Sequence, residues 1–359
     1  MPKSITFLLS GSGQRPVGGF KIVYEYANRL AHRGWRVVII HPTLLWPAFF
    51  KLSLLMKIKV LRAYVRRVIT REYLPLHWMK IDPRIKLQWT VTLDGAFIPD
   101  ADFVVACPVE SALFAVDYPK SKGKKFYFIQ HFEDWNQPRE LVEKSWKLPL
   151  KKIVIAKWLQ NVARDLGEDS VYIPNGLDFS FFKKLKSLSE RPPFSICFLY
   201  HALSWKGTRF AIAAMVALKT KYPQLAVTVF SADCIPEKLP DFFMTHVDPS
   251  QITLRDIYNS STIFISPSLA EGWPLPPAEA MLCGCVVVAT DIGGHREYIQ
   301  DGVNGIFCQS WSAESIVEKV EYIFNNPEIA TRISGAAPAS LQKFDWDSRV
   351  ELFEQALLS

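Results

Sequence analysis

The chain has 359 residues, more than a single hydrophobic core comfortably supports, so two domains are expected. Hydrophobic residues make up 49% of the chain and charged residues 21%, which indicates a soluble globular protein and excludes a disordered one. The net charge of +7 is uneven, since residues 1–180 carry 27 Lys and Arg against 16 Asp and Glu, whereas residues 181–359 carry 15 against 19. The basic first half predicts contact with an anionic partner. No uncharged apolar run reaches the length of about 18 residues that a membrane-spanning helix needs.

The N-terminal segment predicts a strand, a glycine-rich loop, a helix and a second strand. The apolar run Ile5–Leu9 is the first strand and is too short for a secretory leader. The loop follows from Gly11 to Gly19, and Phe20–Arg33 then has apolar residues at helical spacing. Gly34 ends the helix, and Trp35–Ile40 is the second strand. A strand, a helix and a strand in this order predict a parallel sheet covered by helices.

The stretch Leu44–Tyr73 differs from the rest of the first half. It combines many large apolar side chains with seven Lys or Arg residues and a single acid, Glu72. This composition favours an amphipathic element on an anionic membrane surface. A domain helix with one buried face and one solvated face has the same composition, so both interpretations stay open at this stage.

The remaining pattern predicts a second domain of the same style. Further buried strands of the first half are expected at Phe103–Ala106, Phe126–Ile129 and Lys152–Ile155. The polar, proline-containing segment Lys183–Pro193 is where the domain boundary is placed. Beyond it, strands and helices alternate at Ser195–Tyr200, Thr208–Lys219, Ala226–Phe230, Leu254–Asn259, Ile263–Ser266, Pro277–Leu282 and Val286–Thr290. We therefore expect an α/β protein of two Rossmann-like, doubly wound domains, residues 1–183 and 184–345.

The segment Glu271–Gly284 carries the strongest sign of chemistry. It follows a buried strand, and its adjacent prolines suit the start of a helix, where their missing N–H groups would otherwise be unpaired. A helix that begins after a parallel strand attracts anions, so the amides of Gly272, Trp273 and Leu275 are expected to face a diphosphate. Carboxylates at Glu271 and Glu279 can accept hydrogen bonds from the hydroxyls of a sugar and a ribose. The alternative for Glu279 is that it only complements the helix dipole.

Other motifs favour neither a dinucleotide enzyme nor a metal centre. The glycine-rich loop has Pro16 where a third glycine would stand, and no acid follows the second strand. Asp100 and Asp102 resemble a metal-binding Asp-x-Asp pair, but they are interpreted as a turn that enters a strand. The six cysteines form no Cys-x-x-Cys pair and are expected to be free thiols in a reducing cytoplasm. No metal and no cofactor is expected.

At this point the chain resembles the family-4 retaining glycosyltransferases, which belong to glycosyl transferases group 1 and have the GT-B fold. The resemblance rests on two glutamates separated by seven residues and followed by Ala-Met-x-x-Gly. It continues through four further segments in the expected order, at Gly18–Gly19, Ile173–Asp178, Ile292–Glu297 and Asp301–Gly305. The family implies two domains that face a central cleft, with the final helix, residues 346–359, packing back on the first domain.

The resemblance implies roles for residues of the C-terminal domain. Glu279 looks like the carboxylate that holds the nucleotide ribose, and Glu271 like the one near the donor sugar. Lys206 looks like the lysine that neutralises the diphosphate. The family usually has an arginine five positions earlier, where this chain has His201. The phosphate clamp is therefore expected to lack one permanent charge.

The resemblance also implies roles in the N-terminal domain. His131 is similar to a histidine that approaches the donor sugar. Gly18 and Gly19 look like the loop whose backbone passes close to the phosphates, where side chains would obstruct. Pro274 departs from the family, which more often has a small residue with an N–H group there, so no sugar identity is implied.

The implied activity is transfer of a sugar, with retention and without a metal, from a nucleoside-diphosphate sugar to a hydroxyl of a glycan or lipid-linked acceptor in cell-envelope or polysaccharide biosynthesis. The implied location is the cytoplasm, peripheral on the inner face of the membrane through residues 44–73. No nucleic-acid partner is expected. Two alternatives stay open, namely a nucleotide-sugar epimerase of the same fold and a non-catalytic nucleotide-binding or membrane scaffold.

Overall fold

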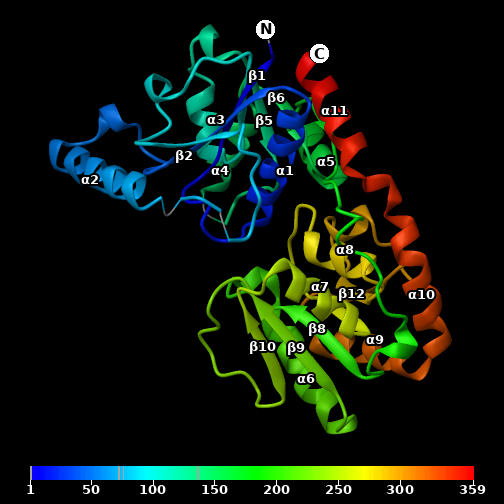
Figure 1. Ribbon diagram of the computed structural model, residues 1–359. Helices are drawn as coiled ribbons and strands as arrows, with labels where there is room; N and C mark the ends of the chain where they lie inside the picture. Colours follow the sequence, from blue (N-terminus) through cyan, green and yellow to red (C-terminus); the bar gives the residue numbers. More distant parts are fainter. Residues whose placement is uncertain (1, 72, 76, 136) are drawn as a thin grey trace. The chain divides into compact units, whose positions relative to one another are not determined.

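The structure is a computed structural model that describes residues 2–71, 73–75, 77–135 and 137–359. It contains two compact units, and the chain passes between them twice (Figure 1). Unit 1 comprises Met1–Asn175 together with Asp347–Ser359, and unit 2 comprises Gly176–Trp346. None of the described helices is apolar over a stretch long enough to cross a bilayer.

Unit 1 is built on a parallel sheet with the strand order β3-β2-β1-β4-β5-β6-β7. The strands are β1 (Ser4–Leu8), β2 (Arg36–Pro42), β3 (Lys86–Thr90), β4 (Phe103–Ala106), β5 (Lys124–Ile129), β6 (Lys151–Val154) and β7 (Ser170–Tyr172). The α-helices of this unit are α1 (Gly18–His32), α2 (Leu54–Thr70), α3 (Val109–Ala115), α4 (Arg139–Trp146), α5 (Lys157–Asp165) and α11 (Trp346–Leu358). Every residue of β1 and β4 is buried, as expected for central parallel strands that have helices on both faces.

Unit 2 has a second parallel sheet, with the strand order β10-β9-β8-β11-β12-β13. Its strands are β8 (Ser195–Leu199), β9 (Ala226–Ser231), β10 (Phe243–Val247), β11 (Ile263–Ser266), β12 (Val286–Thr290) and β13 (Ile306–Cys308). Its α-helices are α6 (Thr208–Lys221), α7 (Gln251–Ser260), α8 (Leu275–Leu282), α9 (Ala313–Asn325) and α10 (Pro327–Ser340).

The two sheets repeat one topology. In each unit the first strand lies in the middle, two strands follow outward on one side, and the chain then crosses to the other side. The predicted α/β class with two doubly wound domains is therefore confirmed. This topology has a switch point beside the first strand, between β1 and β4 in unit 1 and between β8 and β11 in unit 2. Ligands of doubly wound sheets bind at the carboxyl ends of the strands at such a point.

The division between the units lies earlier than the predicted boundary after residue 183. The polar segment Lys183–Pro193 is part of unit 2, although its composition resembles that of a linker. The reason is Arg191, whose buried guanidinium donates hydrogen bonds to the main-chain oxygens of Tyr258, Ser261 and Cys283. These bonds hold the segment against the end of α7 and the end of α8.

The last helix returns to unit 1. Residues 347–359 of α11 cluster with that unit rather than with the preceding helices. The Phe353 ring stacks on Tyr26 at a centroid distance of 4.4 Å, and the indole N–H of Trp35 donates to Glu354 at 2.7 Å. Arg33 pairs with the same carboxylate. Apolar packing and charge thus both hold the C-terminal helix on α1 and its following turn.

Helix α2 differs from all the other helices of unit 1 because it projects from the unit (Figure 1). Val60 is its buried residue. An apolar stripe at helical spacing faces solvent instead, formed by Leu54, Ile58, Leu61, Val65, Val68 and Ile69, which are 39–75% exposed. The predicted alternative of an ordinary domain helix with a buried apolar face is therefore not what the structure has.

Candidate functional site

The carboxyl ends of β8 and β11 bring together two loops of unit 2. The loop after β8 contains the 3₁₀ turn Ser204–Lys206, and the loop after β11 leads to Glu271. The N–H group of Leu269 donates to the carbonyl of Trp205 at 2.7 Å, which joins the two loops. They lie at the switch point of the sheet, where this topology binds ligands.

Gly207 allows these loops to approach each other. Its φ of +67° lies in the left-handed region, and a Cβ atom added there would lie 2.0 Å from the carbonyl oxygen of Pro267. Any other residue would meet both backbone strain and this oxygen. The glycine therefore sets the position of Lys206, which directly precedes it.

Lys206 and Glu271 form an ion pair at this point. The ammonium Nζ lies 2.8 Å from Oε1 and 2.9 Å from Oε2 of the carboxylate, and 13% of the Glu271 side chain is exposed. Burial by itself raises the pKa of Glu271, but the charge and hydrogen bonds of Lys206 outweigh burial and hold that pKa below 4.5. Glu271 is therefore ionised at neutral pH. The two residues that the sequence assigned to phosphate and sugar lie side by side.

A buried histidine stands behind this pair. Nδ1 of His295 lies 2.7 Å from the carbonyl oxygen of Thr290, so Nδ1 is the nitrogen that carries the proton. Nε2 lies 2.8 Å from the hydroxyl of Ser266 and accepts its hydrogen bond. Burial lowers the pKa of His295 to about 4, so the ring is neutral. In the sequence, His295 belongs to the family-like segment Ile292–Glu297, and no separate role is predicted for it.

Glu279 lies on α8, which begins two residues before the predicted start at Pro277. The helix begins at Leu275, and its first turn contains no acid. Glu279 therefore lies too far along the helix to complement the positive end of its dipole. The Glu279 side chain is 4% exposed. Before the helix, Trp273 is a packing residue, since its ring lies 4.7 Å from the Tyr298 ring between centroids. The Tyr298 hydroxyl donates to the carbonyl of Pro274 at 2.8 Å and fixes the entry to the helix.

His201 follows β8 and is held by its own loop. The N–H group of Leu203 donates to Nδ1 of the His201 ring at 3.1 Å, so this nitrogen is unprotonated. Burial and then the charge of Lys206 lower the pKa of His201. The ring is consequently neutral at pH 7, and the position where the family has an arginine carries no positive charge in this chain.

The expected residues of unit 1 lie at the start of α1 and shortly after β5. Helix α1 begins at Gly18, two residues before the predicted start, so Gly18 and Gly19 form its first turn. The side-chain amide of Gln130 donates to the carbonyl of Gly19 at 3.1 Å and links this turn to the end of β5. The next residue, His131, packs edge-on against Trp135 with a centroid distance of 4.4 Å.

Beside these residues lies a half-buried carboxyl group, that of Glu133, for which the sequence predicts no role. Glu133 accepts a hydrogen bond from the N–H group of Val109 at 3.0 Å, at the start of α3. Burial raises the pKa of Glu133 to about 7, with a further contribution from the charge of Glu110. The sequence contains no signal for this environment, because α3 is brought to Glu133 only by the sheet.

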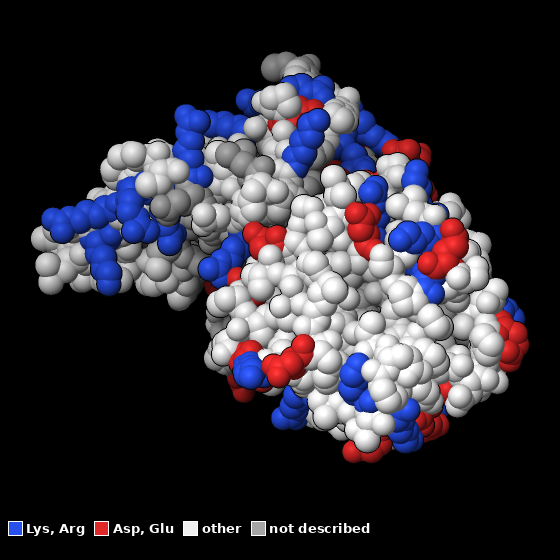
Figure 2. Space-filling model, turned by 60° about the horizontal axis from the view of Figure 1, so that its bottom comes forward, with Lys and Arg blue, Asp and Glu red and all other residues white. Residues whose placement is uncertain are grey.

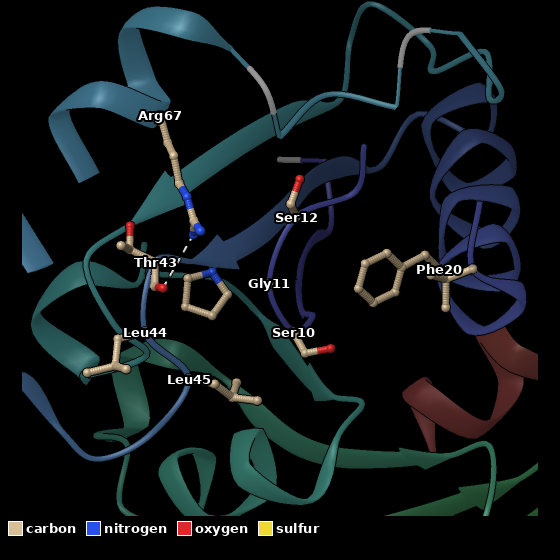
Figure 3. Close-up of a pocket in the computed structure, with 10 residues that line it drawn as sticks. Ser10, Gly11, Ser12, Phe20, Thr43, Leu44, Leu45 and Arg67 are labelled. Atoms are coloured by element: carbon tan, nitrogen blue, oxygen red, sulfur yellow. Dashed lines mark hydrogen bonds between the residues drawn. The ribbon is translucent and has the colours of Figure 1, made fainter. Parts of the chain in front are cut away.

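Unit 1 also contains a pocket of about 520 Å³ between the loops that follow β1 and β2 (Figure 3). Phe20 of α1 lies on one side of it, and Arg67 reaches toward it from α2 on another. The pocket is lined by Ser10, Gly11, Ser12, Val17, Phe20, Pro42, Thr43, Leu44, Leu45 and Arg67. Its walls are mostly apolar, and Arg67 is their one ionisable side chain.

Comparisons with known proteins agree with the motifs. Residues 241–339 match the family described as Glycosyl transferases group 1. A D-inositol 3-phosphate glycosyltransferase of Streptomyces griseus is 30% identical over 110 residues, which are 31% of this chain and 23% of that protein. An N,N'-diacetylbacillosaminyl-diphospho-undecaprenol alpha-1,3-N-acetylgalactosaminyltransferase of Campylobacter jejuni is 21% identical over 336 residues, 89% of this chain and 85% of that protein. The first alignment thus spans less than a quarter of the relative's length.

Solved structures share the fold over almost the whole chain. Sucrose-phosphate synthase from Thermosynechococcus elongatus has a TM-score of 0.73 at 14% identity, over 98% of both chains. Anabaena HepE, in complex with UDP and glucose, has a TM-score of 0.70 at 15% identity, over 99% of both chains. The chain has the GT-B fold, and its resemblance to the group 1 glycosyltransferases is confirmed. The matched segment contains Glu271, Glu279 and His295.

Proposed function

We propose that the protein is a retaining, metal-independent glycosyltransferase that moves a sugar from a nucleoside-diphosphate sugar to a hydroxyl of a glycan or lipid-linked acceptor. The observation that carries the proposal is the Lys206–Glu271 pair at the switch point of unit 2. This pair supplies a cation for a diphosphate and a carboxylate for sugar hydroxyls at the place where doubly wound sheets bind nucleotides.

The proposed chemistry follows the charges that develop during transfer. Departure of the nucleoside diphosphate places negative charge on the phosphates, which Lys206 and the amides of Gly272, Trp273 and Leu275 stabilise. Glu279 accepts hydrogen bonds from the ribose hydroxyls. A leaving phosphate oxygen that takes the acceptor proton makes a protein nucleophile unnecessary, as the family resemblance implies. When the donor binds, Lys206 must give up part of its ion pair with Glu271 in order to contact the diphosphate.

Two of the similar proteins support parts of this proposal. HepE is described in complex with UDP-glucose, which supports a nucleotide-sugar donor. The Campylobacter relative is named for a diphospho-undecaprenol acceptor, which supports a lipid-linked one.

A donor screen tests the proposed activity. The full chain is incubated with UDP-, GDP- and TDP-sugars, with and without envelope lipid extracts, and release of the nucleoside diphosphate is measured. We expect release with one donor class, stimulated by the extract and unaffected by a chelator. Binding without turnover of any donor favours the scaffold alternative, and conversion of the donor into its epimer favours the epimerase.

We also propose that α2 holds the protein on the inner face of the cell membrane. The outward apolar stripe of the helix lies next to basic side chains, and on the face shown in Figure 2 the described residues of the projecting lobe at the left are blue or white, without red ones. Apolar groups that enter the interface and cations that meet anionic lipid are the two contributions that hold peripheral helices on membranes.

A pair of matched valines tests the membrane proposal. Val65 on α2 is 52% exposed and Val216 on α6 is 47% exposed, so Val65→Ser and Val216→Ser make the same chemical change at similar exposure. Sedimentation with vesicles that contain anionic phosphatidylglycerol should weaken several-fold for Val65→Ser alone, because burial of a valine contributes about 1.5 kcal/mol. Binding should also fall with added salt. Equal binding of both variants, or self-association through α2 without vesicle binding, would contradict the proposal.

A further inference from the structure

The pocket of unit 1 has the size and the lining of a ligand site. Its volume of about 520 Å³ lies within the range of about 300–1,000 Å³ that is usual for small-molecule sites. Val17, Phe20, Leu44 and Leu45 supply apolar walls. The polar groups come from the loops at the carboxyl ends of β1 and β2 and from Arg67 (Figure 3). A ligand that suits this lining has an apolar part next to an anionic group.

Arg67 is held in position by its surroundings. Its guanidinium lies over the Trp89 ring at 5.1 Å from the centroid, and Nη1 donates to the carbonyl of Thr43 at 3.4 Å. A guanidinium has five N–H donors, so this single long hydrogen bond leaves donors for an oxyanion. None of the ion pairs among the described residues uses Arg67, and the nearest acid in the sequence, Glu72, lies outside the described residues.

Helix α2 joins this pocket to the proposed membrane surface. Arg67 lies two turns after Val60, the buried residue of the helix, and therefore on its inner face. The apolar stripe that contains Leu61 and Val65 lies on the opposite face. An α-helix with its side chains is about 10 Å across, so a lipid embedded beside the outer face must extend past α2 by about this distance to bring its polar end into the pocket.

We propose that this pocket binds the phosphate-bearing end of a lipid-linked acceptor, with the guanidinium of Arg67 on the phosphate and the apolar walls around the first carbons of the lipid. The substrate class is a long-chain lipid phosphate or diphosphate that carries the acceptor sugar. This inference rests on the proposed transferase function, because it identifies the acceptor of that reaction.

Binding of a short lipid phosphate to the full chain tests the proposal directly. Farnesyl diphosphate, farnesol and inorganic phosphate are titrated separately, and tryptophan fluorescence is followed because Trp89 lies under the Arg67 guanidinium. We expect farnesyl diphosphate to bind more tightly than farnesol, and inorganic phosphate not to compete at equal concentration. Equal affinity for farnesyl diphosphate and farnesol, or full competition by inorganic phosphate, would overturn the assignment.

Two arginine positions on α2 distinguish a specific contact of Arg67 with the phosphate from a general effect of positive charge on the helix. Arg67→Ala should weaken farnesyl diphosphate binding roughly 10- to 100-fold, since a charge-assisted, two-pronged contact is lost. Arg67→Lys should restore part of it, because the charge remains but the planar fork does not. Arg62→Ala removes the same charge from an exposed position of α2 outside the pocket and should leave binding unchanged. The same loss in Arg62→Ala and Arg67→Ala would overturn the proposal.

Two further measurements distinguish a failure of this inference from a failure of the proposed transferase function. UDP binding by Arg67→Ala should equal that of the unaltered protein, which checks folding. If the unaltered protein does not bind any nucleotide, the proposed function fails whatever the lipid result. Vesicles of phosphatidylglycerol without farnesyl diphosphate distinguish the headgroup source: a larger loss of vesicle binding for Arg67→Ala than for Arg62→Ala would mean that Arg67 contacts bulk headgroups, which would also overturn the proposal.

Discussion

Lys206→Met tests the ion pair at the switch point of unit 2. Both oxygens of Glu271 accept hydrogen bonds from Nζ, and the two side chains are 25% and 13% exposed. Removal of one partner from a fully buried pair costs about 3–5 kcal/mol. Because solvent reaches part of this pair, we expect a loss of about 1–3 kcal/mol in the free energy of unfolding. For a unit of this size the loss corresponds to a fall of roughly 3–10 °C in Tm.

The pH dependence of that loss identifies its cause. In the folded protein the pKa of Glu271 is held below 4.5, so the stabilisation by the pair is present above this value and is lost as the pH falls through the folded pKa. Without Lys206, burial raises the pKa of Glu271. At low pH, protonation of Glu271 then removes the unpaired negative charge that destabilises the variant. Denaturant unfolding should therefore show the largest deficit near neutral pH and a small one near pH 4.

A second substitution provides the control. Adding Glu271→Gln to Lys206→Met removes the uncompensated charge and should recover part of the lost stability at neutral pH. The single variant should also bind UDP more weakly, since the cation for the diphosphate is gone. A deficit that is equal at pH 4 and pH 7, or that the second substitution does not reduce, would refute the assigned role of the pair.

Three more outcomes can be measured in the same way. Glu279→Ala should weaken nucleotide binding by about 1–3 kcal/mol through the loss of charged hydrogen bonds, and unchanged affinity in calorimetry would exclude the ribose role. Gly207→Ala should lower the unfolding free energy by more than about 1 kcal/mol because its Cβ atom meets a carbonyl oxygen, whereas Gly11→Ala, also at positive φ but with no atom within 4 Å of its Cβ position, should cost less. His295 has a folded pKa of about 4 against 6.5 for a free ring, so its contribution is complete above pH 6.5 and is lost as the pH falls toward 4. His295→Asn should accordingly flatten the decline of stability over this range, and an unchanged slope would contradict the assigned neutral state.

Much of the fold was predictable because its signals are local. Buried parallel strands appear as short apolar runs, and the predicted strand Ile263–Ser266 is β11 without any change of bounds. Other boundaries moved by up to three residues, as for the start of α1, where the two glycines that suggested a loop begin the helix. The segment Lys183–Pro193 has the composition of a linker, and only the buried hydrogen bonds of Arg191 show that it belongs to unit 2.

The candidate site was predictable in its residues but not in its geometry. Glu271, Glu279 and Lys206 were identified from motifs, yet the contact between Lys206 and Glu271 joins residues 65 positions apart. The neutral state of His201 depends on burial and on the charge of Lys206, and that of His295 depends on burial. Protonation and burial are properties of the packed environment, which no single segment encodes.

By itself, the sequence determined the α/β class, the two doubly wound domains, the family resemblance and the residue types of the donor site, because periodicity and motif spacing are written along the chain. Only the tertiary structure decided which face of α2 is exposed, that Arg67 reaches a pocket and that Lys206 pairs with Glu271. These features depend on which strands become neighbours in the two sheets. Strand pairing brings together residues that are far apart in the chain, and no local pattern specifies it.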